Sequence, residues 1–123
     1  MSDFRQTKAA FDRDIFLSNF HGMDDLISET ISSFFTALPD LTSAIETAIR
    51  EKNLADLELA AHTLKGVVAN FYAEPSKLLA WKLEQIGHGQ LNEDCEIVFR
   101  QLQVELSRLT NELQNLVNET KVA

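Results

Sequence analysis

The chain has 123 residues, enough for one domain with a substantial core, and 45% of them are hydrophobic, which argues against disorder. Four glycines and two prolines favour long regular elements over a turn-rich β fold. The formal net charge of −8 argues against nucleic acid and anionic membrane surfaces as partners, because both would repel the chain.

The cellular compartment is suggested by the cysteine content and the N-terminal stretch. Cys95 is the only cysteine, so no disulfide can form within the chain, and a reduced compartment is expected. The stretch MSDFRQTKAAFDRD has mixed charge and no apolar segment typical of a secretory signal. No apolar run approaches the length of a membrane-spanning helix. We therefore expect a soluble cytoplasmic protein.

Apolar residues recur at spacings of three and four along the chain, the pattern of amphipathic helices, and no strand-like alternation of useful length occurs. A first helix is predicted over residues 8–20. Its apolar side is formed by Phe11, Ile15, Phe16 and Phe20. Gly22 then predicts a helix end, and Asp24 predicts the N-cap of the next helix.

The second predicted helix begins at Asp25 and ends near residue 50. Its apolar positions are Ile27, Ile31, Phe34, Leu38, Leu41, Ile45 and Ala48 or Ile49. Pro39 would remove one helical hydrogen bond, and SAIE at 43–46 offers a capping box for a separate helix. Because the apolar stripe continues in phase across Pro39, we favour one long helix with a kink at this residue.

Two helices follow the polar break EKN. The first is predicted over about 54–71, and the second begins near Pro75 and ends near Ile86, before GHG. The apolar positions of the first are Leu54, Leu57, Ala61, Leu64, Val68 and Phe71. Those of the second are Leu79, Leu83 and Ile86.

The last predicted helix begins at Asn92, with Glu93 and Asp94 in its first turn, and ends near residue 118. Its apolar stripe consists of Cys95, Phe99, Leu102, Leu106, Leu109, Leu113 and Leu116. Four long helices with one apolar stripe each and short connections predict an all-α fold. We expect an antiparallel up-down four-helix bundle with an additional short N-terminal helix, as a single domain over residues 1–123.

The stretch AAHTLKGVVANFY places an unusual group of residues beside the apolar stripe of its helix. His62 and Lys65 are one turn apart, so their side chains can meet. Gly66 removes a side chain next to the histidine, at a cost of about 1 kcal/mol relative to alanine. A histidine that carries a phosphoryl group would benefit from a neighbouring cation and from space for a partner. An ordinary solvated surface is the alternative interpretation.

The same stretch contains the pattern H-x-L-K-G and resembles the histidine-containing phosphotransfer (HPt) family. The resemblance covers about residues 24–88, through FFTALPDLTSAIETAIREKNLADLELAAHTLKG and LLAWKLEQIG. It implies that Nε2 of His62 accepts the phosphoryl group, that Lys65 lies near this group, and that Glu84 accepts a hydrogen bond from Nδ1–H. The residues implied to contact a docking partner are Thr63, Gly66, Val67 and Ala69. Val67 and Tyr72 depart from the family, in which serine and glycine are common at these positions.

The function implied by this resemblance is reversible phosphoryl relay. His62 would take the group from an aspartyl phosphate on a receiver domain of a hybrid histidine kinase and pass it to an aspartate of a response regulator. Direct phosphorylation by the ATP-binding domain of a separate kinase stays open as a second donor. The chain would act as a monomeric carrier rather than an autonomous kinase. It would hold no metal or cofactor of its own, and Mg²⁺ would belong to the receiver domain.

A metal site is one alternative to phosphoryl transfer. Glu58 and His62 are four residues apart on one predicted helix, and this spacing recurs on the next helix between Glu84 and His88. The two pairs could converge on a metal ion inside a bundle. If they do not, His88 and His21 are expected to be loop or cap residues, with His88 past the helix end.

A structural module is the other alternative. The stripe from Cys95 to Leu116 could form a coiled-coil seam and make the chain a dimerisation or scaffold module. Bundle core is the simpler interpretation of this stripe, and it makes Cys95 a packing residue rather than a catalytic thiol.

Overall fold

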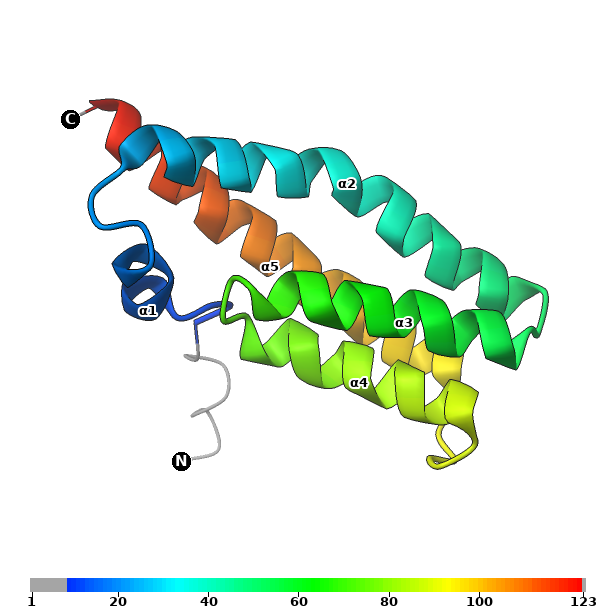
Figure 1. Ribbon diagram of the computed structural model, residues 1–123. Helices are drawn as coiled ribbons and strands as arrows, with labels where there is room; N and C mark the ends of the chain where they lie inside the picture. The colour runs from blue at the N-terminus through cyan, green and yellow to red at the C-terminus, as the bar shows by residue number, and fades with distance from the viewer. Residues whose placement is uncertain (1–8, 123) are drawn as a thin grey trace.

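The computed structural model describes residues 9–122, with side chains over 9–119, and every regular element in that range is a helix. The helices are α1 (Arg13–Ser18), α2 (Asp24–Arg50), α3 (Leu54–Ala69), α4 (Glu74–His88) and α5 (Cys95–Val122). Helices α2 to α5 form an antiparallel bundle, and α1 lies at one end of it (Figure 1). The predicted all-α bundle with a short extra helix is therefore confirmed. None of the helices within residues 9–122 is long and apolar enough to cross a membrane.

Helix α2 continues without interruption through Pro39, as predicted. Figure 1 shows that α2 changes direction near its middle, where proline removes one hydrogen bond of the helix. The Thr42 hydroxyl donates to the carbonyl oxygens of Leu38 and Pro39, each at 3.1 Å. The buried positions on both sides of the proline are Ile27, Ile31, Phe34, Ile45 and Ala48. One face of α2 thus stays on the core along the whole helix.

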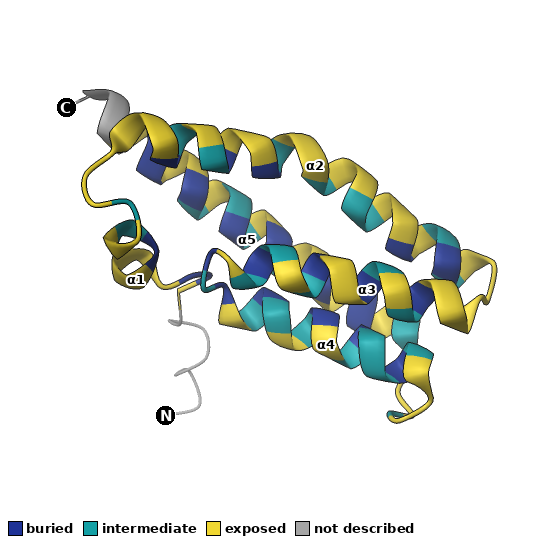
Figure 2. Cartoon of the chain, viewed as in Figure 1, coloured by how far each residue is buried: buried dark blue, intermediate teal, exposed yellow. Residues whose placement is uncertain are grey.

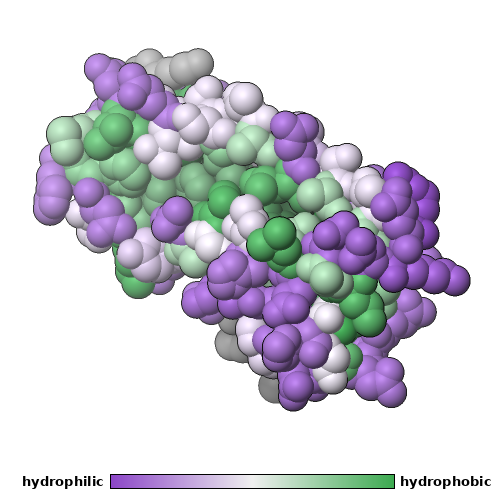
Figure 3. Space-filling model, turned by 45° about the vertical axis from the view of Figure 1, so that its right-hand side comes forward, coloured by the Kyte–Doolittle hydropathy of each residue, from purple (hydrophilic) through white to green (hydrophobic). Residues whose placement is uncertain are grey.

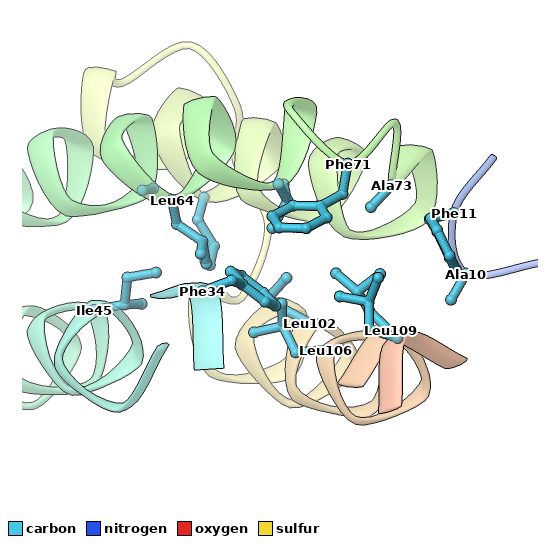
Figure 4. Packing of buried hydrophobic residues seen from close by; sticks show 14 of the residues in the cluster. Ala10, Phe11, Phe34, Ile45, Leu64, Phe71, Ala73, Leu102, Leu106 and Leu109 are labelled. Carbon is cyan, nitrogen blue, oxygen red and sulfur yellow. The ribbon is translucent and has the colours of Figure 1, made fainter. Parts of the chain in front are cut away.

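The core fills the space between the inward faces of the helices (Figure 2). Phe34 and Ile45 from α2, Leu64 from α3 and Leu102 from α5 point towards one another there (Figure 4). The α5 stripe is buried throughout from Phe99 onwards, at Phe99, Leu102, Leu106, Leu109, Leu113 and Leu116. Because this stripe already packs within the bundle, it does not offer a free seam for a coiled coil.

The first helix is shorter than predicted, because its cap lies later in the sequence. The Asp12 side chain accepts a hydrogen bond from the Ile15 backbone N–H at 3.2 Å, so the helix begins at Arg13 rather than near residue 8. Phe11 and Phe16 are buried as expected, but Ile15 is 46% exposed and does not belong to the apolar side.

Two other predicted helix starts also move. Met23, not Asp24, is the N-cap residue of α2, and Asp24 lies in the first turn without capping it through its side chain. Helix α5 begins at Cys95, three residues after the predicted start at Asn92. The Asp94 carboxylate accepts from the Glu96 backbone N–H at 2.9 Å and so caps α5.

The ends of α3 and α4 also differ from the predicted ones. Leu54 is the first residue of α3 and is 53% exposed, so it does not belong to the buried stripe. Phe71 is buried as predicted, although α3 ends two residues before it, at Ala69. Helix α4 continues beyond Ile86 to His88, where Gly89 closes it in the left-handed conformation at φ 83°.

The segment before α2 is fastened to the turn between α3 and α4. The Phe16 ring stacks on Phe71 with centroids 5.1 Å apart, and Phe71 packs on Phe34 at 4.8 Å. Tyr72 joins both parts: its carbonyl oxygen accepts from the Asp12 N–H at 2.9 Å, and its hydroxyl accepts from the Asn19 amide at 3.2 Å. The φ angle of Tyr72 is +56°, a region that glycine adopts without strain. The tyrosine therefore combines a strained backbone with one side-chain contact, to Asn19, that a glycine could not make.

Candidate functional site

The site begins with the close approach of α3 and α4, which make the most extensive contact of any two helices in residues 9–122. Both helices carry small, fully buried residues, Ala61 on α3 and Ser76 and Ala80 on α4. A Cβ atom added to Gly87 would lie 2.6 Å from the backbone nitrogen of Glu58. Glycine is thus required for α3 to lie directly against α4 at this point. Side chains flanking the contact consequently meet across it.

His62 of α3 and Glu84 of α4 form the first such pair. Their atoms Nδ1 and Oε2 are 2.8 Å apart. A carboxylate can only accept, so the Nδ1 atom must carry the proton. The His62 side chain is 63% exposed, whereas that of Glu84 is only 13% exposed. A largely buried carboxylate therefore holds an imidazole proton on Nδ1, and Nε2, the nitrogen without a proton in the neutral form of such a ring, lies on its other side.

Lys65 meets the other oxygen of the same carboxylate. Its Nζ atom lies 2.6 Å from Oε1 of Glu84, close enough for an ion pair, although the angles are not those of a directed hydrogen bond. The ammonium charge, rather than a well-aligned donor, is what stabilises this buried oxygen. Glu84 thus links the two polar residues that the sequence places one turn apart on α3.

Burial and the two neighbouring side chains shift the pKa of Glu84 in opposite directions. Burial alone raises the pKa of the carboxyl, because the charged form is separated from water. The contacts with Lys65 and then His62 act in the other direction and together outweigh burial, so that the pKa of Glu84 lies below its ordinary value. The site therefore holds a carboxylate anion at neutral pH, next to the proton on Nδ1.

The residues expected to contact a partner are not equally accessible. Gly66 is exposed, and a Cβ atom added there would meet nothing within 4 Å. Thr63 is also exposed, but its hydroxyl donates to the carbonyl oxygen of Leu59 at 3.0 Å. Val67 and Ala69 are partly buried, and Val67 packs against the core. The open part of this face thus consists of His62, Thr63 and Gly66.

A second histidine–carboxylate pair lies one turn away on the same two helices. Nδ1 of His88 lies 3.0 Å from Oε2 of Glu58. His88 is the last residue of α4. The prediction that it lies past the helix end, which was based on the flanking glycines, is therefore wrong. The sequence signal for this arrangement was the four-residue spacing from Glu to His on both helices. In an antiparallel pair of helices this spacing leads to crossed contacts, each histidine with the carboxylate of the other helix.

The arrangement of these side chains gives little support to a metal site. Within the part of the chain that the structure describes, no group of three or more His, Cys, Asp or Glu side chains is placed to hold a metal ion. His21 lies in the connection between α1 and α2, as expected. Cys95 is partly buried at the start of α5, where burial and the nearby Asp94 charge raise the pKa of the thiol and disfavour a reactive thiolate.

Comparison with known families agrees with the geometry. The family model of the Hpt domain matches residues 29–119, which includes most of α2 and all of α3 and α4. The chain therefore belongs to the Hpt domain family. Hpt domains serve histidine phosphotransfer in phosphorelays and interact there with receiver domains. A search of curated proteins gave no match.

Proposed function

We propose that His62 is the phosphoacceptor of this Hpt domain and that it relays a phosphoryl group between the aspartates of two receiver domains. The observation that supports this most directly is the 2.8 Å contact between Nδ1 of His62 and Oε2 of Glu84. In the neutral imidazole this contact leaves Nε2 as the nitrogen without a proton, on a side chain that is more than half exposed. A nucleophilic nitrogen at the surface of a rigid helix pair is what an in-line attack on a partner's phosphoryl group requires.

The transfer step balances without any further proton movement. The lone pair of Nε2 attacks the phosphorus of the aspartyl phosphate, the N–P bond forms, and the P–O bond to the aspartate breaks. The electron pair of that bond remains on the released carboxylate. The ring keeps its Nδ1 proton and becomes cationic, and the Glu84 carboxylate stabilises this charge. Transfer to the second receiver reverses these events.

The remaining roles follow from what lies near His62. Lys65 would exchange its contact with Glu84 for the incoming phosphoryl oxygens, and Gly66 would let the receiver approach α3 closely. We assign the reactive aspartate and Mg²⁺ to the receiver domain. The chain would thus be a monomeric cytoplasmic carrier between a hybrid histidine kinase and a response regulator, and not an autonomous kinase.

The test is phosphorylation of the purified chain by a phosphorylated receiver domain. We expect an acid-labile, base-stable phosphate on the wild-type protein and none on His62→Gln, with equal helical content by circular dichroism. The matched control is His88→Gln, which removes the other histidine paired with a carboxylate and should leave the label in place. A label that persists in His62→Gln would disprove the assignment.

A further inference from the structure

A groove of 680 Å³ lies between the second half of α2 and the first half of α3. Its walls expose more apolar than polar surface and are formed mostly by small side chains, among them Ala37, Ala44, Ala48 and Ala60. Figure 3 shows hydrophobic surface, in green, along the hollow that crosses the middle of the molecule. The short side chains leave room for a long and narrow group from another molecule.

The groove is continuous with the surface around His62. Leu59 and Thr63, which lie on the α3 side of the groove, precede and follow His62 on the same helix. Leu59 is 66% exposed, more than any other large hydrophobic residue in the described part of the chain. An exposed leucine one turn from the candidate phosphoacceptor is costly in water and becomes favourable when a partner covers it.

The charged residues of the groove have one sign. Asp40 from α2 and Asp56 from α3 both contribute to its lining, and no lysine or arginine does so. Both aspartates are exposed. A partner group that fits must therefore be apolar along its length and positively charged at its tip. A lysine or arginine side chain has this composition, since its hydrocarbon stem covers apolar surface while its charged end reaches a carboxylate.

We propose that the groove between α2 and α3 accepts a lysine or arginine of the receiver domain, and that Asp40, Asp56 and Leu59 determine which receivers this carrier serves. The inference rests on the proposed relay at His62. A receiver held in this groove lies alongside His62, so docking and phosphoryl transfer use one continuous face. A receiver with an acidic or short side chain at the matching position leaves the two carboxylates unpaired and is rejected.

The test separates phosphoryl chemistry from docking by measuring two steps, labelling by a small donor and transfer of the label to receiver domains. Phosphoramidate, a small donor that needs no docking surface, labels the chain, and purified receiver domains from the same genome then compete to remove the label. We expect Asp40→Lys to slow transfer to the preferred receiver by about tenfold, and Leu59→Ala by about fivefold. Labelling by phosphoramidate should stay unchanged in both variants. A lysine or arginine of that receiver replaced by glutamate should restore transfer with Asp40→Lys.

Glu46→Lys is the matched control, because it makes the same charge change on α2 but lies at a different groove, next to α5. It should alter the transfer rate by less than about twofold. Equal rates for wild type, Asp40→Lys and Leu59→Ala would overturn the groove proposal and leave the relay intact. A wild-type chain that phosphoramidate labels nowhere, or that passes phosphate to no receiver, would instead overturn the relay itself and with it the groove.

Discussion

Glu84 is the residue on which the polar groups of α3 converge, and its ionisation couples the site to stability. Since the folded-state pKa lies below the ordinary value of 4.5, the carboxylate stabilises the fold above that pH. This stabilisation is lost as the pH falls through the folded pKa. We expect Glu84→Gln to lower the free energy of unfolding by about 1 kcal/mol at pH 7 and by progressively less below pH 4.5. Urea unfolding of both proteins across this range measures the difference.

The same substitution separates the two roles of Glu84 in transfer. Glutamine can still accept a hydrogen bond from Nδ1–H of His62 but cannot hold the ammonium of Lys65 by charge. Transfer from a receiver should therefore be slower in Glu84→Ala than in Glu84→Gln. Equal transfer rates for wild type and Glu84→Ala would show that Glu84 takes no part in transfer.

For Gly66→Ala we expect the free energy of unfolding and the transfer rate to change in opposite directions. A methyl group at this position meets no atom of the chain within 4 Å, so alanine can be added without a clash. Gly66→Ala should raise the free energy of unfolding by up to about 1 kcal/mol, because alanine favours the helix. Transfer from a receiver should slow, because the methyl group stands where the partner approaches. Thermal unfolding and receiver-dependent labelling measure the two effects, and a faster transfer would contradict the docking role.

At the scale of helices, Gly87 is the residue that sets the distance between α3 and α4. A Cβ atom there would lie 2.6 Å from the Glu58 nitrogen and 2.8 Å from the Leu54 carbonyl oxygen, both backbone atoms that cannot rotate away. We expect Gly87→Ala to destabilise the fold by about 1–3 kcal/mol and to weaken the His62–Glu84 contact. Urea unfolding provides the measurement. Gly66→Ala is the control, since it makes the same change on the open side of α3.

The helices themselves were largely predictable, because apolar spacing is a local property of the sequence. The inward positions of α2 on both sides of Pro39 followed from one unbroken stripe. The helix ends were less predictable, since Asp12 and Asp94 compete with neighbouring polar residues as caps and only the folded backbone decides between them.

The candidate site was predictable only in part. The spacing of His62, Lys65 and Gly66 is visible on one helix, so local geometry placed them together. The contacts of Lys65 with Glu84 and of His88 with Glu58 depend on how α3 is aligned against α4. That alignment depends on small residues such as the buried Ala80 and the partly buried Gly87, whose effect on a neighbouring helix cannot be derived from the spacing within their own helix.

For the molecule as a whole, the segment around α1 completes the hydrophobic core without taking part in the site. Phe16 of α1 is buried against Phe71, and α1 lies at one end of the bundle (Figure 1). We expect Phe16→Ala to lower the free energy of unfolding by about 3–5 kcal/mol. Phosphoramidate labelling of the protein that remains folded should be unchanged. The neighbouring Ile15→Ala, on the exposed side, should change stability by less than about 1 kcal/mol.

The hydrogen bond made by the Thr63 hydroxyl bears on how long a phosphoryl group would stay on His62. Because this hydroxyl donates its proton to the Leu59 carbonyl oxygen, that proton is not available to a group bound to His62. Val67, at a position where serine is common in the family, adds no hydroxyl either. A phosphoryl group on Nε2, as proposed for His62, would thus find few free hydroxyl donors on this side to orient a water molecule for hydrolysis. Such a surface favours storage: the phosphohistidine would persist until a receiver arrives with its own catalytic groups.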